Sequence, residues 1–188
     1  AAATATFSNE GGLDSLRLTF RPTDQQYKDR VLDAWMPRLT VDFVLCRNNA
    51  GQLEIMLITR VGGYWPNVQW FFGGGQKLGE SMTKTLSRLA MAEAGVNLDE
   101  GSFKIIGDIN RPVVQDTYNP ANPAEKKDAC HTSMHVHLIE VPPEFRPLLD
   151  SRSKDPVWYP INALPANLPE PVRLTLLKLF PDQTNLRE

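Results

Sequence analysis

The residues that could hold a charged ligand gather around a run of glycines and the helix predicted after it. The glycines at positions 73–75 predict a tight turn, and residues 82–94, free of proline and glycine, predict a helix. Ser81 can cap its start and Gly95 suits the left-handed position after its end. Glu93 lies on the apolar stripe of this helix, with Met82, Leu86, Leu89 and Ala90. A buried carboxylate needs a partner, so we expect a metal ion or an arginine beside Glu93.

The spacing of residues 74–96 resembles the box of the Nudix hydrolase superfamily. The matching residues are Gly74, Glu80, Arg88, Glu93, Gly95 and Val96. Two of the three carboxylates expected after the box arginine are replaced, by Leu89 and Ala92. An Arg-Leu-Thr-Met-Ala-Glu run stands at this place in GDP-mannose mannosyl hydrolases, so the chain is similar to that subgroup, which cleaves the sugar C–O bond.

The resemblance implies a set of site residues between positions 24 and 180. Gly73, through its carbonyl, and Glu93 match the ligands of a magnesium ion, for which Mn²⁺ could substitute. Asp42 and Arg60 match substrate-binding positions, and Arg88 matches the box arginine. A diphosphate held by a metal and an arginine becomes a better leaving group, so the implied reaction is substitution at the sugar carbon.

The resemblance is interrupted near the C-terminus, where the general base is expected. When Trp158 is aligned with the subgroup's late tryptophan, Arg152 and Ser153 fall where the subgroup has a glutamine metal ligand and a histidine base. A serine hydroxyl is a poor base near neutral pH. Asp155 and His135 are therefore the candidate catalytic bases.

Each of these side chains also has a structural interpretation. Glu93 could form a buried salt bridge to an arginine instead of binding metal, and Arg88 could join Glu80 in an ion pair that staples the loop. Arg60 could grip phosphate oxygens or lie in solvent, and Asp42 could hold a sugar hydroxyl or be an ordinary strand aspartate. The aromatic side chains around the glycine run could stack on a ligand or fill the core; they are Tyr64, Trp65 and Trp70.

We therefore expect an enzyme that hydrolyses a nucleotide sugar with Mg²⁺ and releases sugar and nucleoside diphosphate. One alternative is a degenerate Nudix domain that binds a small ligand, RNA or protein without turnover, since box carboxylates are missing. The other is a pyrophosphohydrolase that recruits acids such as Glu80, Asp150 or Asp155. A homodimer contact could lie in residues 117–130 or in the N-terminal leader.

The elements that must position these residues follow from periodicity and punctuation. Alternating β-branched and aromatic residues predict a hairpin from strands 39–47 and 53–59, with further strands at 103–109 and 134–141. Helices are predicted at 24–35 and 171–180, in addition to the one at 82–94. The expected architecture is α/β, a Nudix-type α/β/α sandwich with a mixed sheet. Residues 1–23 form a predicted leader and 24–188 a single Nudix domain.

Composition limits the possible partners and the compartment. The chain has 188 residues, 41% of them hydrophobic, which suits one domain with a sizeable core. A net charge of −2 disfavours bulk binding to nucleic acid. No apolar run approaches the roughly 20 residues of a membrane-spanning helix. The two cysteines make no disulfide framework, so we expect a cytoplasmic protein.

Overall fold

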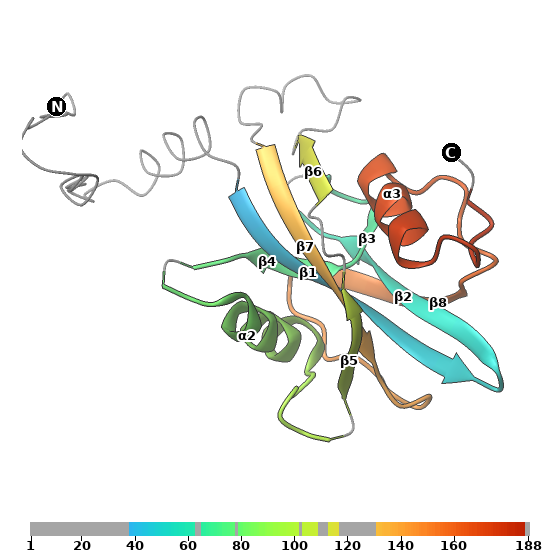
Figure 1. The fold of residues 1–188 in the computed structure, drawn as a ribbon, viewed down its shortest axis with the longest axis horizontal. Coiled ribbons are helices and arrows are strands. Elements are labelled where there is room, and N and C mark those ends of the chain that lie inside the picture. Colours follow the sequence, from blue (N-terminus) through green and yellow to red (C-terminus); the bar gives the residue numbers. More distant parts are fainter. Residues whose placement is uncertain are drawn as a thin grey trace, which may run out of the picture.

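A mixed β-sheet between two helices forms the body of the molecule (Figure 1). The computed structural model describes residues 38–62, 65–77, 79–101, 103–108, 113–116 and 131–186. The helices of this part are α2 (Met82–Ala94) and α3 (Glu170–Leu179). Neither is long and apolar enough to cross a membrane.

The sheet is arranged around β1, which pairs with three other strands. The strands are β1 (Arg38–Asn49), β2 (Gln52–Arg60), β3 (Gln69–Trp70), β4 (Phe72–Gly75), β5 (Lys104–Asp108), β6 (Val113–Asp116), β7 (His131–Glu140) and β8 (Ser153–Pro160). β1 runs parallel to β7 and antiparallel to β2 and β4. β8 extends the sheet along β2, and β5 and β6 both pair with β7. The predicted mixed sheet is therefore confirmed.

Each face of the sheet has its own apolar core. On β1, Val44 and Cys46 contribute to the core under α3, whereas Phe43 and Leu45 contribute to the core under α2. Successive side chains of a strand point to opposite faces, so one central strand serves both cores. This explains why β1 is an almost continuous apolar run. The helices lie on opposite faces of the sheet in Figure 1, as expected for an α/β/α sandwich.

The hairpin of β1 and β2 closes through a turn with two left-handed residues. Ala50 has φ 52° and Gly51 φ 86°, which is the conformation of a type I′ turn. The side-chain oxygen of Asn48 accepts a hydrogen bond of 2.8 Å from the Gly51 N–H. The predicted hairpin is confirmed, and this turn fixes its register.

The helix α2 begins and ends where its capping residues predict. Ser81 accepts a hydrogen bond from the Lys84 N–H. Gly95 adopts φ 68°, and the N–H groups of Gly95 and Val96 donate to the carbonyls of Met91 and Ala90. The Gly95 bond is the five-to-one bond that closes a helix C-terminus at a left-handed residue.

Some elements differ from the sequence-based prediction. The glycines at 73–75 lie in strand β4, with Gly73 opposite Asp42 on β1, and not in a turn. The short strands β3 and β6 were not predicted. Short strands carry too few residues for a period to be detected. The predicted leader, the helix at 24–35 and the segment 117–130 lie outside the described residues.

Candidate functional site

A cavity of about 380 Å³ opens where β1, β2, β4, β7 and the start of β8 meet. Its volume falls in the range of small-molecule sites, roughly 300–1,000 Å³. The lining residues are Thr40, Asp42, Ile58, Arg60, Gly62, Trp65, Trp70, Phe71, Gly73, Gly74, Gly75, Glu93, Thr132, Met134, Arg152 and Ser153. The predicted substrate and metal residues that are described, Asp42, Arg60, Trp65, Gly73 and Glu93, all border this one pocket.

Glu93 reaches the pocket from α2 and has both carboxylate oxygens engaged. Its Oε2 accepts the Gly73 N–H at 2.9 Å, and its Oε1 accepts a hydrogen bond from Arg152 Nη2 at 2.6 Å. The Glu93 side chain is only 5% exposed, whereas that of Arg152 is 65% exposed. Burial raises the pKa of Glu93, while the Gly73 N–H and Arg152 act to lower it. An ion pair between the buried Glu93 carboxylate and the largely exposed Arg152 is thus the arrangement present.

The glycines of β4 make room for this contact. Gly73 has φ 149°, and a Cβ there would lie 2.3 Å from Asp42 Oδ1 and 2.6 Å from the Asp42 Cα. A side chain at Gly74 would press on Leu89. Both glycines therefore allow the backbone of β4 to lie between α2 and Asp42 without a side chain.

Asp42 lies on the pocket wall and is almost fully buried. Burial raises the pKa of Asp42 to about 7, although the Thr40 hydroxyl, which donates to Oδ2 at 2.7 Å, and the charge of Arg60 act to lower it. Its carboxyl group therefore changes charge near neutral pH.

Two arginines meet in the pocket from paired strand ends. Arg60 ends β2 opposite Ser153, and the Val61 N–H donates to the Arg152 carbonyl at 2.9 Å. Burial lowers the pKa of Arg60; the charges of Asp42 and Glu93 raise it, and that of Arg152 lowers it further. Arg60 and Arg152 therefore line one cavity, and the charge of Arg152 disfavours that of Arg60.

Aromatic rings form another side of the pocket. The ring centroids of Trp65 and Trp70 lie 6.1 Å apart, and the Arg60 guanidinium lies 5.4 Å from the Trp70 ring. Within the described residues, the buried Trp65 Nε1 and Thr132 Oγ1 have no hydrogen-bond partner. Such atoms need an explanation in a native structure, and a bound ligand is one. Tyr64 lies outside the described residues.

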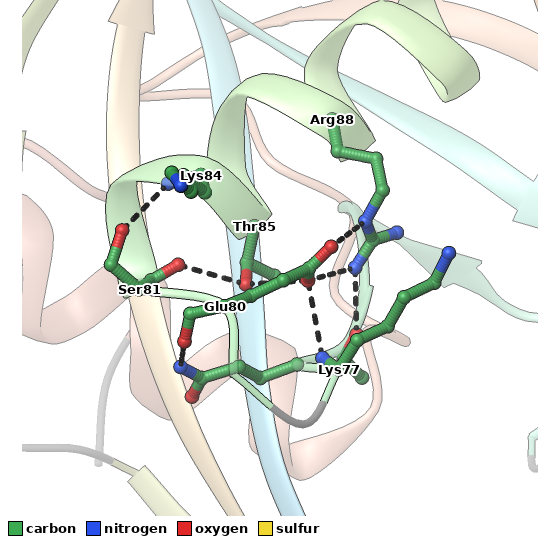
Figure 2. A network of polar contacts seen from close by, with 8 residues as sticks. Lys77, Glu80, Ser81, Lys84, Thr85 and Arg88 are labelled. Carbon is green, nitrogen blue, oxygen red and sulfur yellow. Dashed lines mark hydrogen bonds and ion pairs between the residues drawn. The ribbon is translucent and has the colours of Figure 1, made fainter.

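Arg88 does not line the pocket, and holds the loop before α2 instead. It donates from Nε and Nη2 to the two carboxylate oxygens of Glu80, both at 2.8 Å, and from Nη2 to the Gly75 carbonyl at 3.1 Å (Figure 2). Glu80 also accepts the Lys77 N–H and the Thr85 hydroxyl. The Arg88 hydrogen bond is the main cause that lowers the pKa of Glu80 to about 2. This geometry matches the loop-stapling interpretation of Arg88.

The two candidate bases lie away from the pocket. His135 stands beside Val41 in the β1–β7 register, on the α2 side, while its neighbour Met134 faces the pocket. Asp155 is exposed on β8, with φ 49°, where the register with β2 shifts. Neither borders the cavity. Arg152, for which no role was predicted, does line the pocket. Its alignment with the subgroup's glutamine metal ligand was the signal in the sequence that could have identified it.

The side chains around Glu93 do not fit a divalent metal. Magnesium takes oxygen ligands in an octahedral arrangement. Both oxygens of Glu93 accept N–H donors, one of them from a guanidinium, and the other carboxylate of the pocket, Asp42, accepts the Thr40 hydroxyl. Within the described residues no group of three histidine, cysteine, aspartate or glutamate side chains is placed to hold a metal ion. The Arg152 guanidinium stands on Glu93 Oε1, so a cation would meet a like charge there.

Comparisons with known proteins agree with this fold. The sequence profile of the NUDIX domain matches residues 36–183. A Nudix hydrolase from M. smegmatis is 13% identical, with 77% of this chain and 84% of that one covered and a TM-score of 0.57. A UDP-X diphosphatase is 17% identical, with 86% and 74% covered and a TM-score of 0.50. At such identities the structures show a shared fold alone.

A MutT/nudix family protein from Enterococcus faecalis is 23% identical, with 68% of this chain covered and a TM-score of 0.46; this chain spans 45% of its length. No curated protein matches the sequence.

Proposed function

This chain belongs to the NUDIX domain family, and we propose that it binds and hydrolyses a nucleotide sugar of the GDP-mannose type. The observation that carries this proposal is the meeting of Arg60 and Arg152 on one pocket. Guanidinium groups bind phosphate oxygens in pairs of parallel hydrogen bonds. A diphosphate between the two arginines would relieve their mutual repulsion.

The rest of the pocket suits the two ends of such a ligand. Trp65 and Trp70 offer ring faces for a nucleobase or sugar, and Trp65 Nε1 and Thr132 Oγ1 are polar groups for which the ligand would supply a partner. Asp42 offers a carboxyl oxygen to a sugar hydroxyl or to an attacking water. A neighbour of the same fold is named a UDP-X diphosphatase, which is consistent with this substrate class.

The proposed reaction is attack of water at the sugar carbon. Within the described residues, Asp42 and Glu93 are the acidic side chains that line the pocket, and Glu93 is held by Arg152. Asp42 therefore accepts the proton of the attacking water. The C–O bond breaks, and the nucleoside diphosphate leaves with the bonding electrons, neutralised by Arg60 and Arg152.

Magnesium or manganese belongs to this proposal as a condition to be tested. The family typically uses a divalent metal, whereas the side chains around Glu93 do not form a metal site as they stand. Reactions should therefore be run in parallel with Mg²⁺, with Mn²⁺ and with EDTA.

Product analysis by phosphorus NMR tests the proposal. The full chain is incubated with GDP-mannose and other nucleotide sugars, and free sugar with intact GDP is the expected product. Arg60→Ala should abolish it, while Arg146→Ala, an exposed arginine outside the pocket, should not. GMP with sugar phosphate would instead assign the reaction to phosphorus and refute C–O cleavage.

A second candidate, a ligand-binding domain without turnover, is favoured by the Glu93–Arg152 ion pair, which leaves the remaining box carboxylate occupied. Binding of GDP-mannose without any product would support it.

A homodimer also remains a proposal, and light scattering of the full chain would decide it.

A further inference from the structure

We infer that Arg152 is the built-in cation of this pocket: its guanidinium stands on Glu93 where a divalent metal would bind, so a diphosphate binds here without metal. The inference rests on the proposed function for its ligand, but its claim about the metal stands on the geometry alone.

Glu93 is the residue that needs a cation. It lies on the inner side of α2 among Leu89, Ala90 and Ala94, all buried. An unpaired carboxylate in such surroundings is strongly destabilised. The Gly73 N–H satisfies Oε2, and the Arg152 guanidinium meets Oε1 at 2.6 Å. The charge of Glu93 is therefore balanced by a side chain of the protein itself.

Arg152 is held in this position from two sides. Its Nε donates to Asp150 Oδ2 at 2.8 Å, and its backbone N–H donates to Asp150 Oδ1 at 2.9 Å. Its carbonyl accepts the Val61 N–H. The guanidinium is thus fixed between Asp150 and Glu93, in a rotamer set before any ligand arrives.

Donors of Arg152 remain for a ligand. A guanidinium has five N–H donors, and the bonds to Asp150 and Glu93 use two of them. The side chain is among those that line the pocket, and it is largely exposed. The remaining donors and those of Arg60 therefore face the same space and can hold one diphosphate.

A metal would have to displace this arrangement. A cation on Glu93 Oε1 would need to move the guanidinium and then find further oxygen ligands. A guanidinium keeps its charge at every physiological pH, so it does not yield the position by deprotonation. Binding of nucleotide should consequently be insensitive to chelators.

Manganese binding to the free protein tests the claim about the metal, independently of any nucleotide. Electron paramagnetic resonance should show no specific Mn²⁺ binding to the wild type at millimolar metal. Arg152→Gln removes the charge and offers an amide oxygen, so it should gain a Mn²⁺ site. Arg152→Gln combined with Glu93→Gln should lose that site again. Stoichiometric Mn²⁺ binding by the wild type, abolished by Glu93→Gln, would overturn the inference.

Nucleotide binding tests the cation's role. By calorimetry, the Kd of GDP for the wild type should change less than about twofold between EDTA and Mg²⁺. Arg152→Gln should bind GDP roughly tenfold or more weakly in EDTA and recover with Mn²⁺. Arg152→Lys keeps a charge and should weaken binding less, which guards against a folding defect. GDP binding by the wild type that requires Mg²⁺ would refute the inference. If GDP does not bind under any condition, the proposed function fails, and the manganese experiment still decides the claim about Glu93.

Discussion

At the scale of a single residue, Gly73 connects strand β4 to Glu93 on α2 and to Asp42 on β1. Its N–H binds Glu93, its Cα faces Asp42 across the β1–β4 pair, and its φ of 149° lies in the region that favours glycine. A glycine at this position is therefore required by space as well as by backbone conformation.

Replacing Gly73 by alanine should destabilise the fold by about 3 kcal/mol or more, because the new Cβ would lie 2.3 Å from Asp42 Oδ1 and 2.6 Å from its Cα. Gly75→Ala is the matched control in the same strand, since a Cβ there meets nothing within 4 Å. Urea unfolding measures both, and equal stabilities of the two variants would contradict the close contact.

Asp42 should make stability depend on pH. Its native pKa of about 7 lies above the ordinary value of 3.8 for an aspartate, so the native state binds more protons between these values and the free energy of unfolding falls as pH rises through them. Asp42→Asn removes this titration. Its free energy of unfolding, relative to that of the wild type, should therefore rise by at most about 4 kcal/mol between pH 4 and pH 8.

Urea unfolding over this pH range, read as the difference between wild type and Asp42→Asn, isolates the Asp42 contribution from other groups. Asp155→Asn, exposed and outside the pocket, should leave the profile unchanged. A difference between wild type and Asp42→Asn that stays constant with pH would show that Asp42 titrates normally.

At the scale of the element, the loop before α2 is held by one carboxylate. Glu80 gathers Arg88 and Thr85 from α2 and the Lys77 N–H from the loop (Figure 2). Arg88 also donates to the Gly75 carbonyl, so the start of α2 is held against β4.

Glu80→Gln should lower Tm at pH 7, because the native pKa of about 2 lies below the ordinary 4.5. A lowered native pKa contributes stability that is present above the unfolded pKa and is lost as pH falls toward the native one. The Tm difference from wild type should therefore shrink from pH 5 to pH 2. Glu144→Gln, an exposed glutamate in a loop, is the control. A difference that does not change with pH would exclude this carboxylate as the cause.

At the scale of the whole molecule, the pocket joins elements from both layers. Its lining comes from six strands, from loop residues and from α2, and Arg152 links the start of β8 to α2 across 59 positions of the sequence. A ligand bound there should hold these elements together and raise global stability by linkage.

GDP at 100 times its Kd should raise the free energy of unfolding by about 2.7 kcal/mol, which corresponds to a Tm increase of roughly 5–10 °C. Scanning calorimetry of the full chain measures this shift. At the same GDP concentration Arg60→Ala should show a smaller shift, and Arg146→Ala the full one. An equal shift in both variants would place GDP elsewhere on the molecule.

The elements with strong local signals could be predicted from the sequence by itself. The bounds of α2, its caps at Ser81 and Gly95, and the β1–β2 hairpin follow from interactions between residues close in the chain. The glycine and glutamate spacing of the box likewise identified the family. Such signals depend on periodicity and turn chemistry, which do not need the rest of the fold.

Only the tertiary structure decided which side chains share the pocket. The pairing of β8 with β2 brings Arg152 to Glu93, and the parallel register of β1 and β7 turns His135 to the α2 side. A shift of one residue in either register would exchange the two faces of a strand. Register between distant strands is set by the burial of both cores at once, so the partner of Glu93 was left open by the sequence as either a metal or an arginine.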